Sequence, residues 1–157
     1  EGLIDVYPVF NSNEPYLLQS WGYELVQWEA ADYGIPTLGL TYVTTPDKIA
    51  QDPERIARFL RAALRGIAYA ESHVDEAVDI VLKYTGPETD PAHMRFMLET
   101  ELADAHSALT DEHGTGWQTE EQWQMLIDSL LQYDALAGPV AAGEAFTNQF
   151  LEGARKK

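Results

Sequence analysis

Apolar residues follow one spacing before Thr45 and another after it. Before Thr45, three runs rich in aromatic and branched aliphatic residues are typical of extended backbone. They predict β-strands over residues 3–10, 23–28 and 38–44. Between the first two runs, polar residues around Asn13 predict a short helix that Gly22 closes. Strand, helix and strand within about thirty residues predict a βαβ-like unit with a parallel sheet.

After Thr45 the pattern predicts helices. Asp-Pro pairs at residues 52–53 and 90–91 are typical of a capped helix start, and Thr45 precedes Pro46 in the same way. Residues 119–122 form a capping-box sequence that predicts a further start. The helix from Pro53 carries one apolar stripe, made of Ile56, Phe59, Leu60, Ala63, Leu64 and Ile67. Other helices are expected over residues 73–84 and 144–151, with an acidic, glycine-containing loop around residues 106–116.

One segment carries a family resemblance. It reads NEPYLLQSWGYELVQWEAADYGIPTLGLTYVTT and runs from Asn13 to Thr45. The segment resembles the thiamine-precursor and alkanesulfonate family of periplasmic substrate-binding proteins, in which an NEP-type motif is followed by a DYG-type crossover. The resemblance continues from Thr44 to Gly66 and fades after Tyr84.

The resemblance implies an α/β fold, the C-terminal part of a two-lobed type II periplasmic binding protein that is helix-rich in this segment. Residues 1–33 would end the second lobe, residues 34–45 would form the interlobe crossover and a strand, and residues 46–157 would be the helical C-terminal part of the first lobe. Three strands are too few for a sheet that covers five helices. We therefore expect a processed or excised segment, whose N-terminal half is missing or is replaced by a second copy of the chain.

Charge and composition exclude several classes of function. The chain has 26 acidic and 10 basic residues, and its net charge of -16 opposes binding to nucleic acid or to an anionic membrane surface. It has no cysteine, so disulfides and thiolate chemistry are excluded. The four histidines follow no metal-binding spacing, and a solvated loop explains His106 and His113 better than a cation site. We expect no metal and no cofactor.

The candidate ligand-binding residues gather around the NEP motif, with one addition from the third predicted strand. They are Tyr7, Phe10, Asn11, Asn13, Glu14 and Tyr42. The asparagines offer donors and acceptors to a heterocycle, the aromatic rings offer a stacking surface, and Glu14 offers a carboxylate to a protonated nitrogen. Each has a structural alternative: helix capping for the asparagines, the helix dipole for Glu14, and core packing for the rings.

Two classes of function compete on this basis. The resemblance implies a solute-binding component of an ATP-driven importer, or a ligand-sensing module, that closes around a small organic molecule and hands it to a membrane permease. Its location would be periplasmic or extracytoplasmic, and a pyrimidine-like thiamine precursor is a candidate ligand. The family also includes a pyrimidine-precursor synthase that uses a pyridoxal cofactor, but Lys48 and Lys83 are expected on exposed helix positions. A third alternative is an acidic helical interaction domain that folds alone.

Overall fold

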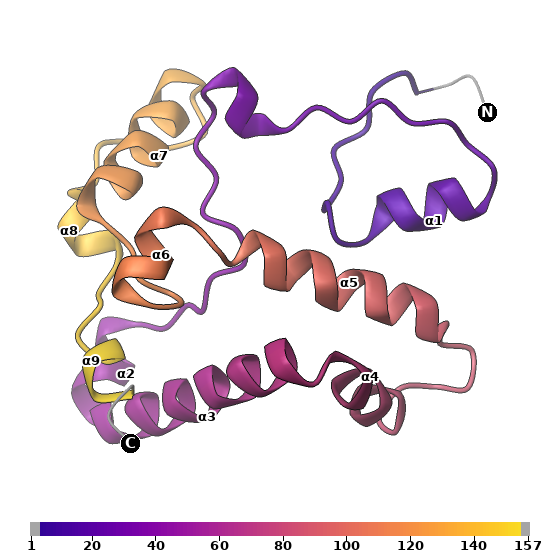
Figure 1. Ribbon diagram of the computed structural model, residues 1–157. Helices are drawn as coiled ribbons and strands as arrows, with labels where there is room; N and C mark the ends of the chain where they lie inside the picture. The colour runs from indigo at the N-terminus through magenta and orange to yellow at the C-terminus, as the bar shows by residue number, and fades with distance from the viewer. Residues whose placement is uncertain (1–3, 155–157) are drawn as a thin grey trace. The chain divides into compact units, whose positions relative to one another are not determined.

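The computed structural model describes residues 4–154, and within this range the regular structure is entirely helical (Figure 1). In chain order the elements are α1 (Glu14–Ser20), the 3-10 helix η1 (Ala30–Tyr33), α2 (Pro46–Gln51), α3 (Pro53–Ser72), α4 (Val74–Leu82), α5 (Pro91–Asp104), α6 (Ala108–His113), α7 (Glu120–Gln132), α8 (Ala142–Ala145) and α9 (Leu151–Ala154). The described residues form two compact units, one from residues 4–27 and 67–105 and the other from residues 28–66 and 106–154.

The prediction of three strands is wrong for the described residues. Residues 4–10, 23–28 and 38–44 have irregular backbone, and Leu3 lies outside the described residues. Their side chains are largely in solvent: Val26 is 78% exposed and Val43, expected in a buried strand, is 89% exposed. A strand forms only when a neighbouring strand accepts and donates its backbone hydrogen bonds, and no segment of residues 4–154 does so here.

The predicted helix starts are confirmed. The Thr45 hydroxyl accepts a hydrogen bond from the Lys48 N–H at 3.3 Å, before α2. The Asp90 carboxylate accepts one from the Ala92 N–H at 2.9 Å, before α5. A reciprocal capping box opens α7, as expected. These side chains satisfy backbone donors that have no partner inside a helix, which is why short polar residues before proline predict a start so well.

Two helix predictions after residue 105 need correction. The expected acidic loop contains α6, whose start is closed by hydrogen bonds between Ser107 and Thr110. The expected helix over residues 144–151 is instead two single turns, α8 and α9. The chain between them is held by Asn148, whose Nδ2 donates to the Gln118 carbonyl at 2.7 Å and whose Oδ1 accepts from the Gln118 N–H at 3.3 Å. These two hydrogen bonds hold Asn148 in a position that competes with a continuous helix over residues 144–151.

In the first unit, α5 contacts both α1 and α4. Pro15 of α1, Val78 of α4 and His93 of α5 are buried. In the second unit, α7 packs against α8, and Ile127, Ala142 and Leu151 are buried. The lobe and crossover boundaries implied by the family resemblance stay predictions, because a grouping of contacts within this chain does not test them.

Candidate ligand-binding site

The NEP motif forms a closed polar turn at the start of α1. The Phe10 carbonyl accepts the Asn13 N–H at 3.0 Å, and Oε2 of Glu14 accepts the Phe10 N–H at 2.8 Å. Oε1 of Glu14 accepts a hydrogen bond from Nδ2 of Asn13 at 3.2 Å. The side chain of Asn13 does not cap α1, so its predicted capping role is wrong; Glu14 binds the preceding backbone instead.

The side chain of Asn11 is hydrogen-bonded to Gln27 of the same unit. Its Oδ1 accepts a hydrogen bond from Nε2 of Gln27 at 3.4 Å, and its side chain is half-buried. The two hydrogens of its own amide have no partner among the described residues. Asn11 can therefore donate to a ligand while its oxygen stays fixed.

The hydrogen bonds of the turn act on the charge of Glu14. Backbone N–H groups of Glu14 itself and of Phe10 stabilise the carboxylate and lower the pKa of Glu14 below its ordinary value of 4.5. Burial raises this pKa by less than either N–H group lowers it, and the Asn13 amide lowers it by less still. Glu14 thus presents a full negative charge at the entrance of the turn.

The aromatic candidates are exposed rather than packed in a core. Tyr7 is 60% and Phe10 is 65% exposed, so both rings are free to stack on a flat molecule. Tyr42 is also exposed and meets Phe59 edge-on, with ring centroids 5.0 Å apart. Tyr42 belongs to the second unit, and the other five candidates belong to the first.

Contacts with α5 and its N-cap that the sequence did not predict support the turn. Ser12, only 4% exposed, donates a hydrogen bond from Oγ to Oε1 of Glu101 at 2.5 Å. Tyr16 stacks on His93 with centroids 4.9 Å apart, and its hydroxyl donates to Oδ2 of Asp90 at 3.0 Å. The buried Nε2 of His93 has no hydrogen-bond partner among the described residues, so stacking holds this ring in place. The partners lie more than 70 positions apart in the sequence, and no local pattern predicts them.

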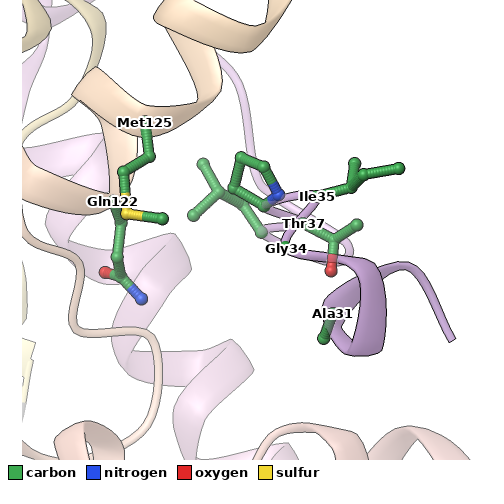
Figure 2. Close-up of a pocket in the computed structure, with 8 residues that line it drawn as sticks. Ala31, Gly34, Ile35, Thr37, Gln122 and Met125 are labelled. Atoms are coloured by element: carbon green, nitrogen blue, oxygen red, sulfur yellow. The ribbon is translucent and has the colours of Figure 1, made fainter.

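The second unit contains a pocket of about 280 Å³ beside the DYG motif. Figure 2 shows Gln122 and Met125 of α7 on one side of it and residues 34–37 on the other. Gly34 has a φ of 71°, which turns the chain after η1. The turn at Gly34 was expected, whereas the approach of Met125 was not, because it depends on how α7 packs.

Comparison with known proteins finds one matching family and two similar binding proteins. Residues 1–77 match the NMT1/THI5-like family. The chain is 32% identical over 145 residues to the riboflavin-binding protein RibY of Chloroflexus aurantiacus, an alignment that covers 90% of this chain and 40% of that protein. It is 27% identical over 148 residues to the formylaminopyrimidine-binding protein of Halalkalibacterium halodurans, covering 91% of this chain and 44% of that protein.

The N-terminal part of the chain, residues 1–77, thus resembles the NMT1/THI5-like family, and the chain is similar to two proteins named for binding a small molecule. The resemblance found in the NEP and DYG motifs is confirmed. The chain spans about two fifths of the length of these curated relatives, both of which are named as binding proteins rather than enzymes. No solved structure matches it.

The NMT1/THI5-like match covers the turn at residues 10–14 and Tyr42, whereas Asp90, His93 and Glu101 lie beyond it. Within residues 4–154, no group of three or more histidine, aspartate and glutamate side chains is arranged to hold a metal ion. Over the same range, no helix combines the length and the apolar character needed to cross a bilayer.

Proposed function

We propose that this chain is part of a solute-binding protein that holds a flat nitrogen heterocycle against the turn before α1. The observation that carries the proposal is the combination of a fixed polar turn with exposed rings on the same segment. Its relatives are named for binding riboflavin and formylaminopyrimidine, and both are flat heterocycles with donors and acceptors on the ring edge.

Each candidate residue has a separate role in this proposal. Tyr7 and Phe10 stack on the ring plane, as aromatic side chains do with flat ligands. The amide of Asn11 donates to the ring edge, and Asn13 holds Glu14 in position. Glu14 accepts a hydrogen bond from a ring N–H or pairs with a protonated nitrogen. Tyr42 stays a candidate from the sequence, and it lies in the second unit.

The charge of the chain supports a neutral or cationic ligand. The first basic residue in the sequence is Lys48, so residues 1–47 have no guanidinium or ammonium group to bind a carboxylate or a sulfonate. The net charge of -16 acts in the same direction. A pyrimidine-like thiamine precursor fits this requirement, and so does the ring system of riboflavin.

We further propose that the rest of the protein completes two lobes around the ligand. The chain spans about two fifths of its curated relatives, and its three β-prone runs are exposed and unpaired among the described residues. Strands from the remaining half would pair with these runs and bury them. Closure at residues 34–37, followed by delivery to the permease of an ATP-driven importer outside the cytoplasm, would complete the cycle.

Substitution of Glu14 by glutamine in the full-length protein tests the site. We expect affinity for riboflavin or formylaminopyrimidine to fall by about 1.5–3 kcal/mol, as for the loss of a hydrogen bond to a charged group, with little change in melting temperature. Glu24→Gln, an exposed glutamate of the same unit, is the matched control and should change neither quantity. Lower stability with unchanged affinity would restrict Glu14 to holding the turn.

The two-half architecture has its own test. We expect the chain alone to expose apolar surface to a fluorescent dye, and to lose this dye binding when it is co-expressed with the remaining half of the protein. A monomer of this chain that melts sharply and binds no dye would contradict the architecture and favour a domain that folds alone.

A further inference from the structure

Helix α3 carries a stripe of arginine residues on an acidic protein. Arg55, Arg58, Arg61 and Arg65 are four of the ten basic residues, and no aspartate or glutamate occurs between residues 55 and 70. Their spacing of three, three and four positions places them on one side of the helix. All four side chains are exposed. This is a concentration of positive charge in a chain of net charge -16.

Three of these arginines have no partner among the residues that the structure describes. Arg55 forms an ion pair with Asp52, in which Nε and Oδ2 are 3.0 Å apart. Among the residues that the structure describes, Arg58, Arg61 and Arg65 make neither an ion pair nor a hydrogen bond. We call these three residues the arginine stripe. Their guanidinium groups are available to a group outside this chain.

The apolar side of α3 lies on the opposite face. Ile56, Leu60, Ala63, Leu64 and Ile67 share that face, and no residue of α3 is buried among the described residues. Covering the apolar face removes hydrocarbon from water and is favourable, whereas covering an unpaired guanidinium group is costly. A partner that covers only the apolar face of α3 therefore leaves the arginine stripe in solvent.

We propose that the arginine stripe is a docking surface for an acidic helix of a partner protein. Guanidinium groups bind carboxylates in a bidentate geometry that suits them to such a surface. The stripe extends over about 10 Å of helix axis, at 1.5 Å per residue, and carboxylates spaced three and four positions apart on a partner helix repeat with the same rise. This inference does not depend on what the turn before α1 binds.

A helix fits the charge distribution better than a membrane or a nucleic acid. Those two present negative charge over areas much wider than the Debye length of about 8 Å, and would meet the acidic remainder of this protein as well as the stripe. A narrow acidic helix contacts the stripe while staying clear of most of the repulsion. Local complementarity then outweighs the net charge.

The test uses two labelled peptides and fluorescence anisotropy with the full-length protein. One peptide is a helix with glutamates on a single face at spacings of three and four, and the other has the same composition with its glutamates distributed around the helix. We expect the one-faced peptide to bind at least about tenfold more tightly, with an affinity that falls as salt rises. Equal binding of the two peptides would overturn the proposal.

Paired charge reversals supply the matched control. Arg61→Glu with Arg65→Glu should weaken binding of the one-faced peptide at least about tenfold, since two ion pairs are replaced by repulsions. Lys48→Glu with Lys83→Glu changes the net charge by the same amount away from the stripe and should leave the affinity within about twofold. An equal loss in both variants would show an effect of net charge alone and overturn the proposal.

Two further measurements keep the result decisive. Circular dichroism checks that the variants remain helical, and Arg61→Gln with Arg65→Gln replaces the charge reversal if the glutamates disturb α3. Vesicles containing phosphatidylserine are titrated in parallel. Binding to the vesicles that depends on the stripe, without binding to the one-faced peptide, would assign the surface to a membrane and overturn the proposal.

Discussion

Helices α3 and α5 are the two longest helices of the described residues, and they differ in what surrounds them. α3 has 20 residues and the cleaner separation of apolar and charged sides, yet none of its residues is buried. α5 has 14 residues, contacts both α1 and α4, and buries His93. A regular amphipathic pattern therefore predicts that a helix forms and which face needs cover, but not whether the same chain supplies the cover.

The environment of α5 depends on polar contacts between distant residues. Tyr16 reaches Asp90 before the first turn of the helix, and Ser12 reaches Glu101 near its end. Arg95, in the middle, pairs with Asp75 in the first turn of α4 and with Glu99 on the next turn of α5. These contacts fix α5 along its length. For α3, the ring contacts are those of Phe59 with Tyr42 and of Tyr69 with His73, directly after the helix.

The largest effect on stability is expected in α4, at a residue buried where this helix packs against α5. Val78 is 5% exposed, and Val78→Ala should lower the free energy of unfolding by about 2 kcal/mol, because it removes buried hydrocarbon and leaves a cavity. Val81 lies on the same helix but is 45% exposed, and Val81→Ala should cost no more than about 0.5 kcal/mol. Urea titration of the full-length protein measures both. If the two variants lost the same free energy of unfolding, the difference between the buried and the exposed side of α4 would be contradicted.

A smaller loss of stability is expected when the contact between α1 and the start of α5 is weakened. Tyr16→Phe keeps the ring that stacks on His93 but removes the hydroxyl that donates to Asp90, and should destabilise the protein by about 1 kcal/mol. Tyr23→Phe, at an exposed tyrosine of the same unit, should be neutral and serves as the control. If the two variants melted alike, the hydrogen bond to Asp90 would not contribute to holding α1 on α5.

The dependence of stability on pH tests the same contact between α1 and the start of α5. The backbone N–H of Ala92 lowers the pKa of Asp90 below its ordinary value of 3.8, and the Tyr16 hydroxyl adds to this effect. Because the pKa is lower in the folded state, the unfolded state binds more protons in this range, so stability rises with pH. The contribution of Asp90 is present above about pH 5 and is lost as pH falls through 3.8 and below the folded pKa.

Asp90→Asn removes this titration while keeping a side chain that can cap α5. Melting temperatures measured between neutral and acidic pH should therefore differ between the two proteins near neutrality and converge in acid. A constant difference across the range would contradict a role for the Asp90 charge.

The smallest effect is expected on the arginine stripe. Arg58→Ala should change the free energy of unfolding by no more than about 0.5 kcal/mol, because Arg58 is exposed and makes no hydrogen bond or ion pair among the described residues. Thermal melts of the full-length protein provide the measurement. A loss above about 1 kcal/mol would mean that the remaining half of the protein already binds this arginine, and the stripe would then not be a free surface.

Local signals determined much of the helical structure and the family resemblance. Proline after a short polar residue marked the starts of α2, α3 and α5, because the side chain and the fixed φ angle act within one turn. The NEP and DYG motifs carried the resemblance that comparison confirms. The position of Glu14 beside a turn also followed from the motif, although its hydrogen bond to Phe10 did not.

Only the tertiary structure decided which predicted surfaces are covered. The runs over residues 4–10, 23–28 and 38–44 have the composition of strands, but strand pairing is a contact between segments, and this chain does not provide it in the described residues. The same holds for Ser12 and Glu101, which meet across 89 positions of sequence. Composition sets what a segment favours by itself, whereas burial and pairing depend on what lies next to it, which no local pattern in the sequence specifies.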